Sequence, residues 1–554
     1  MPGGEIQLVA YGEENIFLNE NPLITFFKIT YRRYTNFSIE TIKTEFIENL
    51  TFGNKFTFEI PKIGDLLHKF WLVINLPNIP IVYNLNNEVD KRLRFAWARK
   101  TAYALIDYVD IDINGQVIDR QWGEWMNVLN ELNTTNFNSS LNQYIGNTPD
   151  FYEYKYTADG IKSLSLYVPL QFWFFKNSGL ALPLLCLEYS TVRVTVNLKN
   201  FENVSIFSPS NYLLLQNYIG KGIKNEPLLQ INNDGYAWGE FDSIDVNTIT
   251  NTSSIYTLYY RQISDVKFSS TKQDYYNNII GSSNFNYGNI IDSTLTGNIT
   301  TENIINNTNN NSKFFIFGLY SKAIFIPIST NDNNFVLENT YIYKPFNLLL
   351  KNMYLLIDFI YIERDERIKF FNQKHEYVIE QVFYTGAKTL KNLSNKNSLE
   401  IINPCKWLIF MGQISYLLNP NVNDFFNYNN TFIRNEFNQI LGKSIIKNAS
   451  ISFNSNQVTS TIDFTYFNDL QVFLNYPQAI KTNGMGVLKF CLYPINTQPS
   501  GSINMSCFNS IDLNTTFRIV EGFNNVYIFK TYAITYNLLR IVNGVAALVF
   551  NTNY

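Results

Sequence analysis

Residues 3–40 read GGEIQLVAYGEENIFLNENPLITFFKITYRRYTNFSIE and join a polar, glycine-punctuated arm to an aromatic and basic cluster. The arm, residues 1–25, carries too little apolar surface to fold alone, so we expect it to lie against a neighbour. Asn21-Pro22 predicts a turn, and the apolar run from Thr25 predicts the start of the folded part. This stretch therefore marks where the arm gives way to the first strand.

The length and composition of the chain favour a large, mostly β protein. At 554 residues the chain suits two domains of roughly 200 residues each, with insertions. Aromatic residues make up 16% of the chain, with 45 Phe and 37 Tyr, and this favours pleated sheets over helical bundles. The formal net charge of -3 creates no strong field toward nucleic acid, so no direct nucleic-acid role is expected.

Cysteine usage and hydropathy predict a soluble protein that is made in the cytoplasm. The chain has four scattered cysteines and no CxxC pair, as in reduced proteins: Cys186, Cys405, Cys491 and Cys507. Charged residues interrupt the two longest apolar runs, residues 170–189 and 348–362, so neither run predicts a membrane span. The first residues, MPGGE, contain no apolar signal core and no Met-Gly start for myristoylation.

Alternation of apolar and polar residues predicts strands along the first part of the chain. Strands are expected at residues 35–47, 55–60, 65–77, 104–112 and 163–170. Asn114-Gly115 predicts a hairpin turn after the fourth of them. Residues 95–105 and residues 119–132 are predicted as helices, the second with Trp122, Trp125 and Met126 on one side.

The second part of the chain has a similar pattern of short strands and turns. Strands are predicted at residues 348–363, 375–383, 399–411, 462–474, 487–493 and 526–550. Between the first two, residues 364–373 (RDERIKFFNQ) predict a short charged helix.

Several acidic residues and one histidine have the side chains of functional sites, but their spacing favours structural roles. His68 would need a second histidine or nearby carboxylates to bind a metal, so a hydrogen-bonded strand histidine is expected. Asp107, Asp110 and Asp112 do not have the spacing of an EF-hand loop, which favours a solvated strand face.

Two further charged groups are interpreted in the same way. Glu124 and Glu131 could imitate a glycosidase pair, but a polar helical face is the favoured interpretation because nothing places them in a cleft. Residues 364–367 alternate in charge and predict a solvated or interface face of a helix. The sequence therefore predicts no catalytic residue, no cofactor-binding residue and no metal ligand.

Motifs in the first half resemble those of the major capsid proteins of nucleocytoplasmic large DNA viruses. QLVAYG, NPLITFFK and YRRYTNF, within residues 7–37, are similar to the amino-terminal signature of that family. NGQVIDRQWGEWMNVLNEL at residues 114–132 resembles a second family element, and PLQFWF with GLALPL at residues 169–184 resembles a third. Three blocks in the family's order make this resemblance specific.

The second half extends the resemblance nearly to the last residue. YIERDERIKFFNQKHEYVIEQV at residues 361–382 resembles the family's link between two jelly rolls, and QPSGSINMS at residues 498–506 resembles a later element. Residues 526–550 resemble the closing strand, except that Ala546 or Ala547 stands where the family has its second glycine.

The resemblance implies an all-β fold of two tandem eight-stranded jelly-roll β-sandwiches (a double jelly roll), with a few short helices and long loops. The expected domains are an arm at residues 1–25, a first roll at 26–363 with a long loop insertion at about 201–345, a linker helix at 364–375 and a second roll at 376–554.

The same resemblance implies a structural, non-enzymatic role as a major capsid protein. Three copies would form a pseudo-hexameric capsomer of an icosahedral shell, without a cofactor. The expected partners are other copies in the homotrimer, neighbouring capsomers, minor capsid and penton proteins and an inner lipid membrane. The protein would be made in the host cytoplasm and would reside in the virion.

The insertion is the part that the resemblance does not cover. Residues 277–312 are rich in Asn, Ile, Thr, Ser and Gly and contain no Lys or Arg, so they predict a surface coat and no packed core. Asn251, Asn298, Asn306 and Asn310 begin N-x-S/T sequons, which leaves glycosylation open. In the family, such an insertion forms part of an outward-facing tower.

Two other function classes remain as alternatives. Jelly rolls also occur in lectins, so a carbohydrate-binding or glycan-cleaving β-sandwich is the first alternative. Nucleic-acid binding by Lys28, Arg32 and Arg33 among aromatic residues is the second. The net charge argues against the second, and a contact between subunits or at the shell floor is favoured for these residues.

Overall fold

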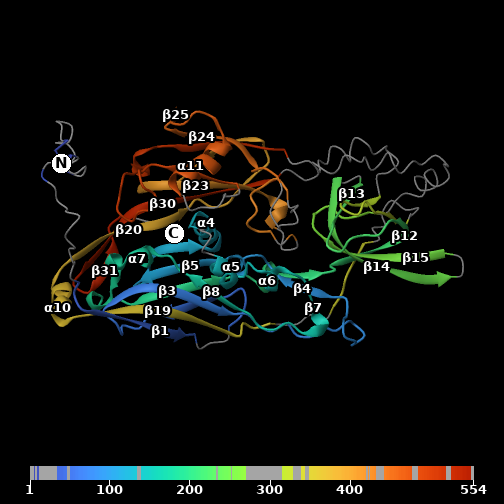
Figure 1. The fold of residues 1–554 in the computed structure, drawn as a ribbon, viewed down its shortest axis with the longest axis horizontal. Helices are drawn as coiled ribbons and strands as arrows, with labels where there is room; N and C mark the ends of the chain where they lie inside the picture. Colours follow the sequence, from blue (N-terminus) through green and yellow to red (C-terminus); the bar gives the residue numbers. More distant parts are fainter. Residues whose placement is uncertain are drawn as a thin grey trace.

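The described chain forms an elongated molecule of two β-sandwiches and one separate sheet (Figure 1). The computed structural model describes residues 5–6, 9–10, 21, 34–46, 50–133, 139–232, 235–250, 253–269, 315–328, 338–343, 348–418, 422, 424–431, 442–476, 484–519 and 526–550. The arm at residues 1–25 and the basic cluster therefore lie almost entirely outside the described residues.

Two facing antiparallel sheets form the first roll. One sheet has the order β1 (Phe37–Glu45), β19 (Asn352–Ile362), β3 (Leu66–Asn75) and β8 (Ser165–Pro169), and β9 (Leu182–Pro183) also pairs with β3. The other has the order β2 (Lys55–Glu59), β10 (Val192–Leu198), β5 (Ile106–Ile113) and β6 (Gln116–Trp122). The first and last strands, β1 and β19, are neighbours in register from Phe37 opposite Ile362 to Glu45 opposite Tyr354.

Apolar and polar residues alternate strictly along β2 of the first roll. Phe56 and Phe58 point inward from β2 while their neighbours are exposed. From the facing sheet, Phe70 packs edge-on against Phe174 with 5.4 Å between ring centroids. Burying one such side chain contributes about 1.5–3 kcal/mol, so alternating strands of this kind favour one pairing register.

The second roll repeats the strand order of the first. One sheet has the order β20 (His375–Tyr384), β30 (Tyr527–Val542), β23 (Pro404–Ile414) and β27 (Met485–Lys489). The facing sheet has the order β22 (Ser394–Ser398), β29 (Ile511–Phe517), β24 (Ile446–Phe453) and β25 (Asn456–Gln457). Four short strands pair beside these: β21 (Lys388–Leu390), β26 (Ile462–Asp463), β28 (Ile503–Asn504) and β31 (Val545–Leu548). Because first and last strands are again neighbours, the fold is a tandem pair of eight-stranded jelly rolls, as predicted.

The region between β10 and β19 is folded, which corrects the predicted long loop. A small sheet joins β11 (Ser205–Ser208), β4 (Arg94–Trp97) and β7 (Lys155–Tyr156). A seven-stranded sheet, called here the insertion sheet, contains β12 (Asn211–Ile219), β13 (Pro227–Asn232), β14 (Gly235–Thr250), β15 (Ser253–Gln262), β16 (Ile316–Gly318), β17 (Ile324–Pro327) and β18 (Glu338–Thr340).

The insertion sheet closes on itself, because β12 pairs with both β15 and β17. Leu213, Leu258, Tyr260 and Phe325 are among the buried residues of its own apolar core. Short strands supply this core, and β16 and β17 are buried along their whole length. Composition alone did not indicate such a core. The Asn-rich tract at residues 277–312 lies outside the described residues. The predicted division into an arm, two rolls and a linker helix stays a prediction.

Short helices connect the strands. They are α3 (Thr101–Leu105), α4 (Gly123–Asn133), α5 (Ser139–Tyr144), α6 (Pro149–Tyr152), α7 (Trp173–Lys176), α10 (Arg364–Asn372) and α11 (Gln471–Asn475), with a π-helix at Tyr466–Leu470. Further 3₁₀ turns lie at Thr157–Asp159, Ser178–Leu180, Leu184–Cys186, Phe201–Asn203, Ser415–Leu418 and Met505–Cys507. The predicted charged helix at residues 364–373 is confirmed as α10.

Four predicted elements differ from the structure, because long-range packing and strand pairing override the local sequence pattern. Residues 94–97 form β4 instead of helix, and residues 116–122 form β6, so the second predicted helix begins only at Gly123. The turn at Asn114 (φ 52°) and Gly115 (φ 82°) pairs β6 with β5. Residues 466–475 are helical instead of strand, and residues 526–550 form the hairpin of β30 and β31.

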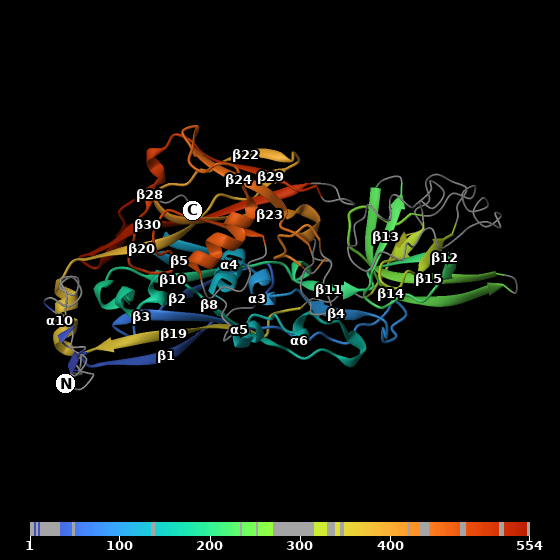
Figure 2. The same cartoon turned by 45° about the horizontal axis from the view of Figure 1, so that its top comes forward.

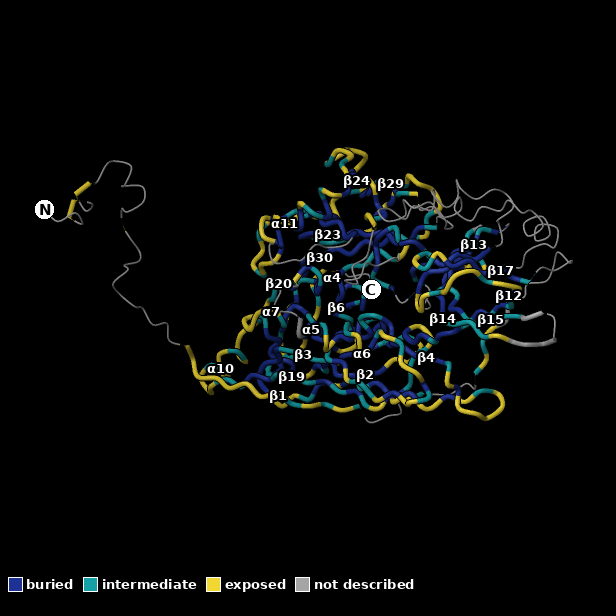
Figure 3. Tube along the Cα trace, turned by 45° about the vertical axis from the view of Figure 1, so that its right-hand side comes forward, coloured by how far each residue is buried: buried dark blue, intermediate teal, exposed yellow. Residues whose placement is uncertain are grey.

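The two rolls lie side by side, with α10 at one end of the molecule and the insertion sheet at the opposite end (Figures 1 and 2). Helix α10 buries none of its residues and stands out as exposed chain in Figure 3. Within the described ranges, the helices are all too short or too polar to span a membrane.

Candidate functional site

Helix α4 of the first roll builds the junction between the two rolls. Trp125, Val128, Leu129 and Leu132 share one buried cluster with residues of all four central strands of the sheet that begins with β20. The Trp125 ring lies 5.7 Å from the rings of both Trp407 and Tyr532. The junction therefore has the apolar character of a domain core.

This packing explains why β23 is buried along nearly its whole length. Trp407, Ile409 and Met411 face α4, whereas Leu408 and Phe410 face the interior of the second roll. A strand that is covered on both sides needs a continuous apolar sequence, and WLIFM at residues 407–411 supplies it.

A buried polar cluster lies inside the junction and centres on Glu124. Its carboxylate accepts hydrogen bonds from Lys530 Nζ at 2.9 Å, Tyr428 Oη at 3.1 Å and Tyr532 Oη at 3.0 Å. Lys530 also donates to Gln413 Oε1 at 3.0 Å. Burial, with the negative charge of Glu124 added, raises the pKa of Tyr532 well above its ordinary value. The tyrosine thus stays protonated and remains a donor to the carboxylate.

Direct bonds join the edge strand β6 of the first roll to β20 of the second. Val382 N donates to Asp119 Oδ1 at 3.0 Å, and the Gln381 amide donates to the carbonyl of Ile118. Asn537 Nδ2 donates to Gln381 Oε1 at 2.9 Å. Side chains thus satisfy backbone groups where two sheet edges meet without forming a ladder.

A second ionic contact across the rolls centres on Glu380. Lys406 Nζ, which is fully buried, lies 2.5 Å from its carboxylate, and Lys176 of α7 lies 2.7 Å from it. Burial alone would raise the pKa of Glu380, but the two lysines together hold that pKa below its ordinary value. The two cations offset the cost of burying this carboxylate.

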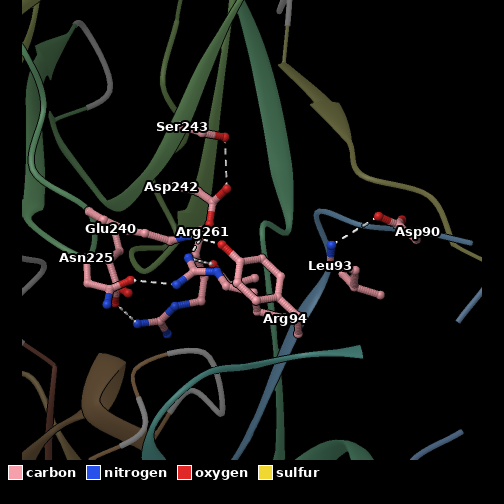
Figure 4. Close-up of polar contacts among 11 residues, drawn as sticks. Asp90, Leu93, Arg94, Asn225, Glu240, Asp242, Ser243 and Arg261 are labelled. Carbon is pink, nitrogen blue, oxygen red and sulfur yellow. Dashed lines mark hydrogen bonds and ion pairs between the residues drawn. The ribbon is translucent and has the colours of Figure 1, made fainter. Parts of the chain in front are cut away.

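A buried ion pair attaches the insertion sheet to the first roll (Figure 4). Arg94 of β4 pairs with Asp242 of β14, and each side chain is only 3% exposed. Arg94 also donates to Asn225 Oδ1 at 3.0 Å and to Ser208 Oγ at 3.2 Å. Within the insertion sheet, Arg261 pairs with Glu240.

An aromatic ring lies beside both guanidinium groups of this junction. The centre of the Tyr154 ring is 4.9 Å from the guanidinium carbon of Arg94 and 5.7 Å from that of Arg261. Burial raises the pKa of Tyr154 well above its ordinary value, so the ring is neutral. Each buried arginine is therefore neutralised by a carboxylate and also contacts an aromatic ring. These contacts hold the insertion sheet against the first roll.

The acidic residues singled out in the sequence have structural partners, and two predictions about them are wrong. Asp110 and Asp112 are buried, not solvated: Arg120 binds Asp110 through two bonds of 2.6 and 2.7 Å, and Gly115 N donates to Asp112. Glu124 lies in the junction and not on a solvated helical face, whereas Glu131 pairs with Lys100.

The remaining candidates behave as expected where they are described. His68 Nδ1 forms a hydrogen bond with the carbonyl of Phe174 at 2.8 Å, and burial lowers the pKa of its ring. In α10, Arg367 binds Asp65 at 2.5 Å. Lys28, Arg32 and Arg33 lie outside the described residues.

The contacts at the two junctions are packing contacts, hydrogen bonds and ion pairs between parts of one chain. The described part of the chain has no group of three or more His, Cys, Asp or Glu that could hold a metal. Phe172, Trp173 and Phe174, which could have formed a sugar-stacking platform, are buried. The carboxylates at the junctions form ion pairs with lysine or arginine side chains.

Sequence reasoning missed Arg94, Asp242, Arg261 and Glu380. A signal was present, because each charge interrupts an apolar or aromatic strand, as in RLRFAWA at residues 92–98. A charge in such a run is costly to bury alone and so implies a partner, but the sequence does not name that partner.

Comparison with known proteins gives consistent matches along the chain. Residues 25–235 match the family described as "Major capsid protein N-terminus", and residues 366–547 match "Large eukaryotic DNA virus major capsid protein". The chain is 30% identical to Probable capsid protein 4 of Acanthamoeba polyphaga mimivirus, covering 100% of both chains. It is 24% identical to the major capsid protein of Phaeocystis pouchetii virus, again over 100% of both.

Solved structures share the fold at lower identity. The Faustovirus major capsid protein superposes with a TM-score of 0.58 at 11% identity, covering 96% of this chain and 94% of that chain. A chain in the quasi-atomic structure of the PBCV-1 virus capsid has a TM-score of 0.57 at 18% identity, covering 95% and 100%.

Proposed function

Because this chain belongs to the major capsid proteins of large eukaryotic DNA viruses, we propose that three copies form a pseudo-hexameric capsomer of an icosahedral shell. Its role is structural: it assembles with copies of itself in the capsid of the virion. The trimer, the six-sided outline and the icosahedral shell are the proposed part.

The observation that carries the proposal is the repeated strand order of the two rolls. The rolls lie side by side and are pinned by α4, so one chain offers two similar building blocks of fixed relative position (Figure 2). A closed ring of three such chains presents six similar blocks, and cyclic symmetry needs only one repeated contact. A rigid junction is what this arrangement requires, because movement between the rolls would change the outline.

The two ends of the molecule suit different faces of a shell. The insertion sheet lies at one end of the molecule, which suits an outward-facing tower, while α10 lies at the other end (Figure 1). We infer that the α10 end faces the shell interior, toward minor capsid proteins and an inner membrane, with penton proteins at the vertices. Synthesis in the host cytoplasm and the absence of a catalytic step are parts of the same proposal.

Light scattering of the purified protein tests the trimer. We expect a mass of about three times 64.4 kDa at micromolar concentration, and six-sided particles in electron micrographs. Metal analysis should find no stoichiometric zinc, because the described residues offer no cluster of ligands. A monomer at that concentration, or bound zinc in equal amount, would contradict the proposal.

A further inference from the structure

One side of the second roll carries an exposed apolar surface made by two segments. Leu470, Phe473 and Leu474 lie three and four residues apart on the helical segment that ends with α11, so they share one face of it. In the loop after β27, the exposed apolar residues are Leu492, Tyr493 and Ile495. The exposed fractions of all six side chains lie between 50% and 74%.

The two segments meet at one end of the same sheet. Asn468 Oδ1 accepts a hydrogen bond from Met485 N at 3.0 Å, which holds the start of the helical segment against β27. At its other end, the Tyr476 ring packs on Trp407 at 5.9 Å, and Trp407 is the strand partner of Lys489. The loop carrying Leu492 begins directly after this point, so the two halves form one surface.

The surface is also uncharged. Residues 490–511 contain no Asp, Glu, Lys, Arg or His, and neither do residues 470–480. Monomeric proteins rarely expose a large apolar patch, and their surfaces carry interspersed charged residues. The opposite face of the same helical segment already packs inside the molecule, because Val472 and Tyr476 are buried in the junction with α4. The exposed face therefore has no intramolecular role within the described residues.

We propose that this surface, called the α11 face, is where a second copy of the chain docks in the capsomer. The inference rests on the proposed function and assigns one of its contacts. Every copy presents the α11 face, so its partner must be equally abundant, and another copy of this chain meets that condition. In a ring of three, the contact is heterologous: the α11 face meets a different surface of the next copy.

The area and chemistry agree with a contact between subunits. A large side chain offers roughly 150–200 Å² when fully exposed, so the six together expose on the order of 600 Å². A standard interface buries about 800 Å² on each partner, and its core is depleted of charge. A lipid surface is disfavoured as the partner, because the face has no Lys or Arg to bind anionic headgroups.

Substitution of the exposed residues tests the α11 face. Phe473→Ser with Leu474→Ser should raise the concentration at which the oligomer dissociates at least tenfold in light scattering, while the fold stays intact by circular dichroism. The matched control is Leu85→Ser with Val458→Ser, which removes apolar side chains of similar exposure elsewhere (64% and 56%). The control should dissociate like the unaltered protein.

A photo-crosslinking benzophenone residue at position 473 gives a second measurement on the folded, purified protein. We expect a covalent dimer from position 473 and none from position 458. The inference about the α11 face would be overturned if the Phe473 and Leu474 substitutions left the oligomer unchanged and position 473 gave no covalent dimer. That result would leave the proposed capsomer standing. Crosslinks from position 473 to the same chain would also overturn it. So would flotation of the protein with phosphatidylcholine vesicles, if the Phe473 and Leu474 substitutions abolished that flotation. An unaltered protein that never associates would instead contradict the proposed capsomer.

Discussion

Removing the Asp242 carboxylate should release the insertion sheet from the first roll. Asp242→Ala leaves the Arg94 guanidinium buried, with only Asn225 and Ser208 as neutral acceptors. A buried charge that loses its counter-ion typically costs about 3–5 kcal/mol. At about 1.4 kcal/mol per tenfold change, the equilibrium for opening this junction should shift by roughly 10²- to 10³-fold or more.

Replacing both charged partners should cost much less. Arg94→Met together with Asp242→Leu removes the uncompensated charge and keeps similar volume, so the remaining cost is the lost hydrogen bonds to Asn225 and Ser208. Each of these two acceptors that is left without a donor costs about 1–3 kcal/mol. We expect the double variant to be at least about 2 kcal/mol more stable than Asp242→Ala, because it leaves no buried charge without a partner.

Hydrogen exchange followed by mass spectrometry is the suitable assay, because a multi-part chain need not unfold in one step. Protection should fall in residues 211–262 in Asp242→Ala and stay unchanged in β3 and β30. Asp150→Ala is the control, since its pair with Lys155 is exposed and should contribute under about 1 kcal/mol. Equal protection in Asp242→Ala and the unaltered protein, or a double variant as damaged as the single one, would refute the reasoning.

Four further predictions follow from the junctions and from the sequence. Trp125→Ala should cost about 3–5 kcal/mol in urea unfolding by opening a cavity between the rolls, whereas the exposed Leu85→Ala should cost little. Glu380 has a lowered folded pKa, so its stabilisation is present above the ordinary glutamate pKa and is lost as pH falls through the folded pKa; Glu380→Gln should flatten this part of the stability–pH curve. Shortening the tract at residues 270–312 should leave the trimer folded, because loop closure costs only about 0.6 kcal/mol per doubling of length; aggregation would show that the tract is structural. A chain that lacks residues 1–20 should form trimers of near-normal thermal stability that assemble poorly into shells, and normal assembly would exclude an assembly role for the arm.

Period-two alternation made most strands of the two rolls predictable. Residues 55–60 correspond closely to β2, because one buried face imposes an apolar residue at every second position. Residues 65–77 correspond to β3, whose apolar run is mostly buried, as predicted. Helix α10 was predictable for a similar local reason, since its charges favour an exposed short helix. The errors at residues 119–122 and 466–475 arose where the same local pattern suits both a strand and a helix, and long-range packing decides between them.

The charged side chains show where prediction from the sequence ended. Glu124 and Asp110 have the sequence surroundings of exposed acidic residues, yet Asp110 is buried and the Glu124 side chain is only 14% exposed. Their partners differ in kind: Arg120 lies in the strand next to Asp110, whereas Lys530 is 406 residues from Glu124. Burial of a charge depends on whether a counter-ion reaches the same position, and chain folding alone decides this for distant residues.

The sequence by itself determined the class of this protein: a chain of alternating strands with capsid-family motifs in order. Alternation and turn residues are local properties, and they act before any distant contact forms. Only the tertiary structure decided that α4 joins the two rolls, that the insertion is a closed sheet, and that Arg94 and Asp242 meet. Those contacts connect residues far apart in the chain, so they depend on the geometry of whole sheets and not on neighbouring residues.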